Sequence, residues 1–271
     1  MKVLVTGHKG YIGSKLFAKL NDVANTVHGI DLQEGKSVIN HLPAVSYDCV
    51  FHLAAFPSVQ HSVNNPSDTF RNNAYGTSVL LEWAKNNNVR RVVFSSSAAA
   101  NCLNSPYGLQ KYISEKECRL YSQLYGLDTV SLRYHNVYSE DQEYGGPYST
   151  VISAWMHMIR AGKPLGIDGD GEQTRDFVHV DDVVGANIFC MNYQNNFDGE
   201  IFDVASGVSY SLNQIRKLIN LNHKVQWDTR PARKGDIKHS HSHISGLLSI
   251  GWKPSVSIEE GLERCFKKEK T

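Results

Sequence analysis

The chain has 271 residues, and its 28 lysines and arginines balance 27 aspartates and glutamates, so the formal net charge is +1. This balance excludes a strongly basic nucleic-acid binder, and no apolar run approaches the ~20 residues of a membrane-spanning helix. The five cysteines form no CxxC pair. We therefore expect a reduced, cytoplasmic protein with free thiols and no membrane or nucleic-acid partner.

The first half of the chain alternates apolar strands with helical patterns. Short apolar, β-branched runs predict strands at Lys2–Thr6, Val27–Ile30, Cys49–Leu53, Arg91–Ser95 and Thr129–Arg133. Apolar residues at helical spacing predict helices at Tyr11–Leu20, Thr77–Lys85 and Tyr107–Tyr125. Strands that alternate with helices predict an α/β fold with a Rossmann-type, doubly wound parallel sheet.

The last third of the chain is less regular. Helical patterns are separated by glycines and prolines, and they fall at Val151–Ala161, Val180–Cys190, Leu212–Ile219 and Ile258–Phe266. We expect a smaller, discontinuous substrate domain near the carboxyl ends of the sheet, where such sheets bind ligands. The expected boundaries are residues 1–138 and 174–205 for the sheet domain, and 139–173 and 206–271 for the smaller one.

A glycine-rich loop joins the first predicted strand to the first predicted helix. It runs from Gly7 to Gly13 and spaces its glycines as GxxGxxG. The first glycine allows a tight turn, the second lets the backbone approach a pyrophosphate, and the third lets helix and strand pack closely. Three glycines alone are weak evidence, but inside a βαβ unit they favour a dinucleotide-binding loop over an ordinary turn.

Asp31 ends the second predicted strand, 18 residues after Gly13. A carboxylate at this place accepts hydrogen bonds from an adenosine ribose and repels a 2′-phosphate. Leu32 and Gln33 follow it, and neither is an arginine that would pair with such a phosphate. The sequence thus favours NAD over NADP. Lys9 is a cation in the same region, and we interpret it as a solvated surface residue.

Tyr107 and Lys111 lie four residues apart in a predicted helix, which places both on one face. A nearby ammonium favours a phenolate, which exchanges a hydroxyl proton near neutral pH. Such a pair is common by chance as an ordinary amphipathic pair. However, three serines, residues 95–97, end the preceding strand and are placed to bind a substrate oxygen. Together these features indicate a catalytic site.

These motifs together resemble the extended short-chain dehydrogenase/reductase family. The chain is most similar to its nucleotide-sugar epimerase/dehydratase branch, and within that to UDP-glucose and UDP-N-acetylglucosamine 4-epimerases. The resemblance runs nearly from end to end. Further segments that resemble the family are residues 52–55, 73–77, 132–138, 169–177 and 230–236.

The resemblance implies a role for each matching position. Tyr107 would be the base, Lys111 its cationic partner and ligand of the nicotinamide ribose, and Ser97 a hydrogen-bond donor to the reacting oxygen. The implied NAD contacts, apart from that pair, are Gly7, Gly10, Tyr11, Ile12, Gly13, Asp31, Leu53, Ala54, Ala55, Asn73 and Ser95. The implied substrate contacts are Asn136 at the sugar or its phosphate, Gly166 and Ile167 at uracil, Arg175 and Arg233 at the diphosphate, and Asp236 at the uridine ribose.

A last implied substrate position is Ser240, which would border the substituent on C2 of the sugar. The related 4-epimerases that carry a bulky tyrosine there act on plain hexoses. Ser240 is small, so we expect room for an N-acetyl group, and UDP-N-acetylglucosamine to be accepted alongside UDP-glucose.

The chain departs from the family pattern in three places. Only 16 residues separate Asp31 from Asp48, where the family carries a further strand, a helix and an adenine-contacting aspartate. We expect that element to be missing, with residues 38–42 in its place. The residues after Ser97 and after Asn136 also differ from the family's, which predicts reshaped loops.

The main hypothesis is an NAD-dependent 4-epimerase that converts a UDP-hexose or UDP-N-acetylhexosamine through a 4-keto sugar. A 4,6-dehydratase or a UDP-sugar-acid decarboxylase is an alternative, but the family members of those kinds carry carboxylates where this chain has Ala98 and Ala99. A non-catalytic NAD-binding sensor or scaffold is a third reading, motivated by the shortened adenine region. The complete set of Ser97, Tyr107 and Lys111 argues against it.

The resemblance also implies a homodimer. Helices at residues 73–85 and 107–125 would pair with their twofold mates in a four-helix bundle, and the apolar residues offered for it are Leu80, Trp83, Leu120 and Leu124. Finally, His239, His241 and His243 alternate as metal ligands in a strand sometimes do. No further ligand motif accompanies them, so we expect no metal site.

Overall fold

The computed structural model describes residues 1–145, 149–232 and 238–267. The chain packs into two compact units, and each consists of two separate stretches. Unit 1 comprises Met1–Tyr134 and Val184–Asp203, and unit 2 comprises His135–Val183 and Val204–Thr271. Residues 135–138, 174–183 and 204–205, which we expected in the sheet domain, therefore pack with unit 2.

Unit 1 is built around a six-stranded sheet in the order β10-β5-β4-β3-β1-β2. Its strands are β1 (Lys2–Thr6), β2 (Thr26–Ile30), β3 (Cys49–His52), β4 (Arg91–Ser97), β5 (Asp128–Tyr134) and β10 (Glu200–Val204). The pairs that join β5 through to β2 are parallel. The expected doubly wound sheet is therefore present, and β10 was not foreseen.

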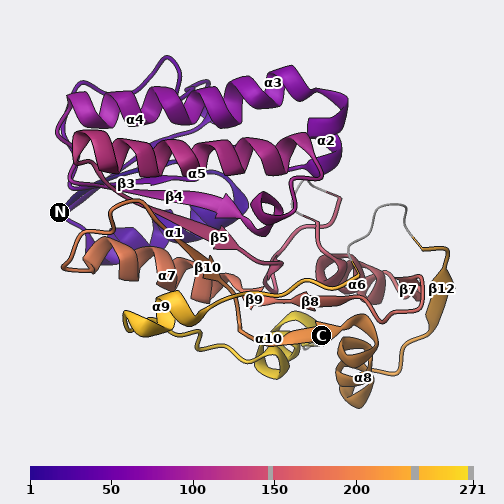
Figure 1. Ribbon diagram of the computed structural model, residues 1–271. Coiled ribbons are helices and arrows are strands. Elements are labelled where there is room, and N and C mark those ends of the chain that lie inside the picture. The colour runs from indigo at the N-terminus through magenta and orange to yellow at the C-terminus, as the bar shows by residue number, and fades with distance from the viewer. Residues whose placement is uncertain (146–148, 233–237, 268–271) are drawn as a thin grey trace. The chain divides into compact units, whose positions relative to one another are not determined.

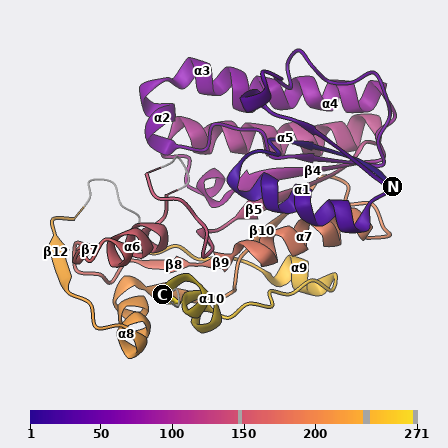
Figure 2. The same cartoon turned by 180° about the vertical axis from the view of Figure 1, so that it is seen from behind.

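Helices cover both faces of this sheet. The longer ones are α1 (Tyr11–Val23), α4 (Gly76–Asn86), α5 (Pro106–Tyr125) and α7 (Val180–Asn192, in unit 1 from Val184 on). Figures 1 and 2 show α4 and α5 on one face, and α1 and α7 on the other. Two short helices, α2 (Val59–Asn64) and α3 (Pro66–Phe70), precede α4. No helix in the described part of the chain is both long and apolar enough to cross a membrane.

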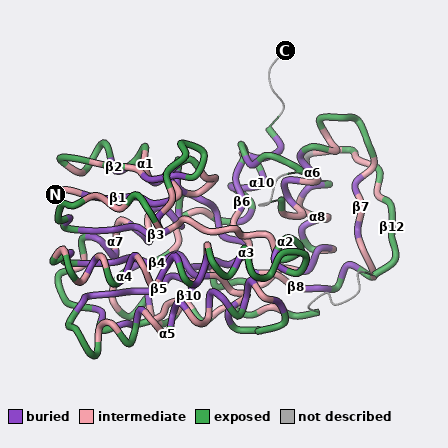
Figure 3. The backbone as a smooth tube through the Cα atoms, turned by 90° about the horizontal axis from the view of Figure 1, so that it is seen from above, coloured by how far each residue is buried: buried purple, intermediate pink, exposed green. Residues whose placement is uncertain are grey.

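The core of unit 1 lies between the sheet and its helices. Strands β3 and β4 are buried along nearly their whole length (Figure 3), as expected for parallel strands that are covered on both faces. Their apolar side chains form a cluster with helix residues that include Leu80 and Leu81. A buried sheet of this kind holds the loops at the ends of its strands rigidly.

Strand β2 is the edge of the sheet, and the extra element of the family is missing there. Residues 31–48 contain a single 3-10 turn, Leu32–Glu34. The hydrophobic side chains of Val38 and Tyr47 pack against the unit 1 core in its place. The indole of Trp83 also donates a hydrogen bond to the carbonyl of Pro43, 2.9 Å away. As expected, residues 31–48 form no further strand or α-helix, and Val38 and Leu42 of the expected segment 38–42 pack against the core instead.

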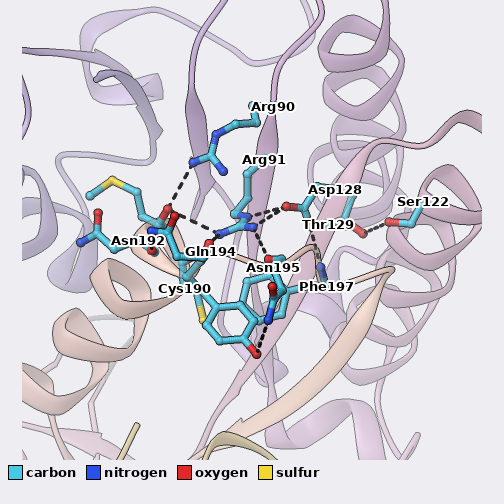
Figure 4. A network of polar contacts seen from close by, with 12 residues as sticks. Arg90, Arg91, Ser122, Asp128, Thr129, Cys190, Asn192, Gln194, Asn195 and Phe197 are labelled. Carbon is cyan, nitrogen blue, oxygen red and sulfur yellow. Dashed lines mark hydrogen bonds and ion pairs between the residues drawn. The ribbon is translucent and has the colours of Figure 1, made fainter. Parts of the chain in front are cut away.

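A buried arginine anchors the return of the chain to the sheet (Figure 4). Arg91 begins β4, is fully buried and pairs with Asp128 at 2.6 Å. Its guanidinium also donates hydrogen bonds to the carbonyls of Cys190, Tyr193 and Asn195, at 2.6–2.7 Å. These carbonyls belong to the end of α7 and the loop after it, where helical partners are lacking. Arg91 thereby fixes the segment that leads into β10.

Among its described residues, unit 2 contains three two-stranded sheets, four complete helices and the first turn of α7. The pairs are β6 (Val137–Tyr138) with β9 (Val178–His179), β7 (Leu165–Asp168) with β12 (Trp227–Arg230), and β8 (Thr174–Asp176) with β11 (Ser209–Ser211). The helices are α6 (Val151–Arg160), α8 (Leu212–Asn222), α9 (Ser245–Ser249) and α10 (Ile258–Phe266). The apolar faces of α6, α8 and α10 enclose a second core around Trp155 and Phe177.

Candidate active site

The first and last glycines of the glycine loop are packed too tightly to carry a side chain. Gly7 has a φ of +76°, and a Cβ on it would lie 2.7 Å from the amide nitrogen of Ala54. A Cβ on Gly13 would overlap the carbonyl oxygen of Gly7. The contacting atoms are backbone, so they have little freedom to move. This is the cradle that a dinucleotide pyrophosphate requires.

The same loop ends at the N-terminus of α1. Gly10 is the N-cap and has no side chain that would occupy the first helical amides, and the first turn contains no acidic residue. Tyr11 and Ile12 form that first turn and are half-buried. A helix start of this kind attracts an anion. The loop therefore fits the pyrophosphate of NAD.

Asp31 joins the glycine loop to the end of β2. Its side chain is buried, and its carboxylate accepts hydrogen bonds from the backbone amides of Lys9, at 2.8 Å, and Gln33, at 2.9 Å. A carboxylate has about four lone-pair sites, so two remain for the hydroxyls of a ribose. The ribose contact of Asp31 stays a prediction.

The loop after β3 packs against the glycine loop and is held by Asn73. This loop contains residues 53–55, all half-buried. The Asn73 amide accepts a hydrogen bond from the amide nitrogen of Phe56, at 2.7 Å, and donates to the carbonyl of the same residue, at 3.1 Å. It also donates to the side chain of Gln110, at 2.8 Å. Asn73 therefore positions the loop that borders the predicted cofactor site.

Lys111 is a buried cation beneath the catalytic region. Its Nζ donates a hydrogen bond to the carbonyl oxygen of Ser95, at 2.7 Å, and lies 4.7 Å from the centre of the Phe94 ring. Burial lowers the pKa of Lys111 to about 8, against the opposing effect of Glu115. Ser95 thus contributes its carbonyl to Lys111, while its hydroxyl bonds to the phenol of Tyr134, 2.8 Å away.

His52 is a buried histidine near Lys111 that connects neighbouring elements by hydrogen bonds. Its two ring nitrogens hydrogen-bond with the hydroxyls of Thr6, at 2.8 Å, and Thr77, at 3.0 Å. Burial, together with the charge of Lys111, lowers the pKa of His52 to about 3. The imidazole therefore stays uncharged and connects β1, β3 and α4. The sequence indicated His52 only as part of a motif.

Tyr107 lies in the first turn of α5. Ser105 caps this helix by accepting a hydrogen bond from the amide nitrogen of Gly108, at 3.1 Å. The amide nitrogen of Tyr107 donates to the hydroxyl of Ser62, at 3.1 Å, and its side chain is 8% exposed. Lys111 follows one helical turn later, on the same face.

Ser97 lies at the junction of β4 and a short 3-10 helix that packs against the start of α5. It ends β4 and caps the 3-10 helix Ala98–Asn101, accepting a hydrogen bond from the amide nitrogen of Ala99 at 3.2 Å. A Cβ on Gly108 would lie 2.5 Å from the carbonyl oxygen of Ala99, so this 3-10 helix packs directly against the start of α5. The hydroxyl of Ser97 still has a proton to donate.

Unit 2 contains a cavity of about 390 Å³. Strand β7 alternates, so Gly166 and Asp168 line the cavity, whereas Ile167 is buried in the core. Asn136 and Arg175, two of the residues proposed to contact the substrate, also line it. The remaining walls include Trp155, Phe177 and Arg230. Ile167, which the resemblance placed at uracil, is therefore not among the residues that line the cavity.

Arg230 and Trp155 were not foreseen. The guanidinium of Arg230 occupies the space that a side chain at residue 166 would need, and the indole of Trp155 donates a hydrogen bond to the carbonyl of Gly166 at 2.9 Å. The sequence signal for Arg230 was its place at the start of the family-like segment 230–236. Arg233 and Asp236 lie outside the described residues.

Ser240 lies beside β8. Its amide nitrogen donates a hydrogen bond to the carbonyl of Thr174, at 3.2 Å, one residue before Arg175. Ser240 is half-buried and is not among the residues that line the cavity. The neighbouring His239, His241 and His243 are exposed, and the described residues contain no group of three side chains that could hold a metal ion.

The fold and this set of residues define an enzyme that works with a bound dinucleotide. The model of the NAD dependent epimerase/dehydratase family matches residues 3–205. The chain belongs to this family, which confirms the resemblance noted from its motifs and the expectation of NAD as the cofactor.

Known relatives match nearly the whole chain. It is 31% identical to a putative UDP-glucose 4-epimerase of Methanocaldococcus jannaschii, over 97% of this chain and 96% of that protein. The UDP-N-acetylglucosamine 4-epimerase of Methanobrevibacter ruminantium M1, solved with UDP-N-acetylmuramic acid, is 33% identical with a TM-score of 0.90, over 98% and 97% of the two chains. The UDP-glucose 4-epimerase of Thermotoga maritima, solved with UDP-glucose, is 31% identical with a TM-score of 0.86, over 98% of each chain.

Proposed function

We propose that this enzyme is a 4-epimerase of UDP-sugars. The observation that carries the proposal is the buried Lys111, one helical turn from Tyr107, beside a strand end that presents Ser97. These three side chains together can move a proton to and from a sugar hydroxyl. The names of the relatives support a UDP-sugar as the substrate.

In the proposed reaction, Tyr107 and Ser97 act on the hydroxyl at C4 of the sugar. Tyr107 removes the hydroxyl proton, and Ser97 donates a hydrogen bond to the same oxygen. NAD held at the glycine loop would supply reversible hydride transfer at C4. After the 4-keto sugar has presented its other face, Tyr107 gives the proton back, so the net reaction is an isomerisation. The cationic Lys111 stabilises the phenolate form of Tyr107.

Unit 2 supplies a binding site of the right size and character for the nucleotide. Its cavity of about 390 Å³ lies within the ~300–1,000 Å³ usual for small-molecule sites. Trp155 and Phe177 offer apolar walls for a base. Arg175, which also lines the cavity, offers a guanidinium for phosphate oxygens. We propose that Arg233 and Asp236 complete this site.

The alternative reactions of the family have less support. Dehydration needs a further acid and base, and the residues after Ser97 are alanines that form the 3-10 helix Ala98–Asn101. A non-catalytic NAD sensor would have no use for a buried lysine beside a tyrosine. The dehydratase and the sensor each predict a different result when the protein is incubated with nucleotide sugars.

The test is incubation with a panel of UDP-, GDP- and CDP-sugars, with products separated by chromatography and weighed by mass spectrometry. We expect the 4-epimer of a UDP-sugar and no change in mass. A 4-keto-6-deoxy product would instead establish a dehydratase. Absence of any conversion, with no transient NADH fluorescence, would favour the sensor.

We further propose that the enzyme accepts UDP-N-acetylglucosamine alongside UDP-glucose, because Ser240 is small. Ser240→Tyr is expected to remove turnover of the acetamido sugar and to spare that of UDP-glucose, since packed pockets yield little to added volume. Paired assays of both sugars with wild type and variant decide this. Equal turnover of the acetamido sugar by both proteins would show that Ser240 is not the gate.

A further inference from the structure

Three basic side chains surround Glu34 at the end of β2. The carboxylate of Glu34 lies 3.3 Å from Nε2 of His8, 3.3 Å from Nζ of Lys9 and 3.9 Å from Nζ of Lys36. Desolvation alone would raise the pKa of Glu34, but the hydrogen bond from Lys9 and the charges of the three basic groups outweigh it and leave the pKa lowered. Glu34 is therefore an ionised carboxylate that holds two lysines.

This cluster is built on the turn that Asp31 caps. Glu34 and Lys36 donate backbone hydrogen bonds to the carbonyl of Asp31, both at 3.0 Å, and Lys9 donates its backbone amide to the Asp31 carboxylate. In dinucleotide-binding sheets the residue at the place of Asp31 meets the 2′-hydroxyl of the adenosine ribose. The phosphate that distinguishes NADP would therefore lie next to Lys9 and Lys36.

His8 holds Glu34 in place. The ring of His8 is buried and lies 5.0 Å from the Phe17 ring, centre to centre. It also fills the space beside Gly29, where a Cβ would lie 2.5 Å from the ring. A fixed imidazole gives the exposed Glu34 one rigid partner, and this keeps its carboxylate between the two lysines.

The charges in this cluster balance. Lys9 and Lys36 bring two positive charges, and Asp31 and Glu34 bring two negative ones, while His8 adds a positive charge only when it is protonated. A phosphate monoester carries about −1.5 to −2 near neutral pH and needs cations that are free to pair with it. With Glu34 present, the two lysines are already paired, so a phosphate meets no net attraction.

We propose that Glu34 is a second determinant of cofactor choice, which disfavours NADP by pairing with Lys9 and Lys36, the two cations that would otherwise accept its 2′-phosphate. Asp31 repels that phosphate directly, whereas Glu34 withholds the cations that would accept it. This inference rests on NAD binding at the glycine loop. Lys9, which we first interpreted as a solvated surface residue, is a paired cation beside the ribose site.

The first test is the affinity of the full chain, stripped of cofactor, for NAD and for NADP, measured by calorimetry. Glu34→Gln keeps the shape of the side chain and removes its charge. We expect it to tighten NADP binding about tenfold, because two lysines are released to the phosphate, and to change NAD binding less than about twofold. The control is Glu82→Gln, which breaks a comparable surface pair with Lys85 on α4 and should alter neither affinity.

A double-mutant cycle gives the second test. Lys9→Met alone should leave NADP binding unchanged, because Glu34 already holds Lys9, but in the Glu34→Gln background it should remove most of the gain. The gain should also shrink as salt is added, since it is electrostatic. If folded Glu34→Gln binds NADP no better than wild type, or if Lys9→Met has the same effect in both backgrounds, the proposal is wrong. These affinities do not depend on whether the enzyme is a 4-epimerase.

Discussion

Lys111 is the residue whose surroundings matter most for the proposed chemistry. Its position in α5 is plain in the sequence, but its burial and its hydrogen bond to the Ser95 carbonyl come from packing against β4. Burial costs a charged lysine its hydration, which brings its pKa down to about 8. The proton on Lys111 is therefore held loosely enough to be lost under mildly alkaline conditions.

A pH profile tests this environment. Lysine loses its charge as the pH rises through its pKa, so the support for the Tyr107 phenolate should fade above about pH 8. We expect the turnover rate to fall on the alkaline side, with a midpoint near that pKa. Lys111→Arg should move this fall to higher pH, because a guanidinium stays charged. A wild-type rate that is flat to about pH 10 would contradict the assignment.

The role of Tyr107 has a direct test. Tyr107→Phe removes the hydroxyl that moves the proton, and we expect turnover to fall by about 10²–10⁴-fold while NAD remains bound. Tyr112→Phe, five residues further along α5, is the matched control and should keep nearly full activity. Wild-type activity in Tyr107→Phe would refute the mechanism, whereas loss of NAD as well would indicate a structural role.

Among the elements, the glycine loop shows how backbone contact decides which residue a position tolerates. A Cβ on Gly13 would overlap the Gly7 carbonyl, but a Cβ on Gly76 would meet its nearest neighbour at 3.8 Å. Gly13→Ala should therefore cost about 1–3 kcal/mol of stability and weaken NAD binding. Gly76→Ala, at the first residue of α4, should be neutral or stabilising by up to ~1 kcal/mol. Denaturant unfolding and NAD titration of both variants measure this, and equal effects would contradict it.

The end of α7 depends on Arg91. Removing one partner of a buried pair leaves the other charge uncompensated, so Arg91→Met should destabilise the protein by about 3–5 kcal/mol. Three backbone carbonyls would lose their donor at the same time. Arg90→Met, on the exposed neighbour, is the control and should cost less than about 1 kcal/mol. Denaturant unfolding measures the free energy of unfolding of both variants. Similar midpoints for the two variants would disprove the anchoring role.

At the scale of the whole molecule, we propose a homodimer. Leu109, Leu120 and Leu124 are 47%, 48% and 62% exposed and share one face of α5. Leu80, which the sequence also offered for this surface, is fully buried in the core of unit 1, and the Trp83 indole bonds to Pro43. The apolar face left for a partner is therefore the leucine side of α5.

Light scattering tests the dimer. We expect wild type to be dimeric at micromolar concentration and Leu124→Glu to be monomeric, because a buried carboxylate would lack a partner. Leu221→Glu, which changes a 77% exposed leucine on α8, is the control and should remain dimeric. A monomeric wild type would reject the proposal.

Local patterns predicted most of the sheet and its helices. The strand Lys2–Thr6 and the helix Ile258–Phe266 match the structure in full, and other predicted elements differ by a few residues at their ends. The missed elements are the short strands β6 to β9, β11 and β12, the helices α2, α3 and α9, and the sheet strand β10. Two- to four-residue strands carry too little periodicity to be recognised, and β10 depends on a neighbour, β5, that is far away in the chain.

What the sequence alone determined was the chemistry carried by short, contiguous motifs: the glycine loop, Asp31, the spacing of Tyr107 and Lys111, and the missing element after β2. These features depend on local spacing, which the order of residues contains. The tertiary structure decided the rest. Packing buried Lys111 and lowered its pKa, and it directed the side chain of Ile167 into the core of unit 2. It also joined Asn73 to the loop after β3 by hydrogen bonds and placed Glu34 between two lysines. Burial and charge pairing arise between elements, so they exist only once the chain has folded.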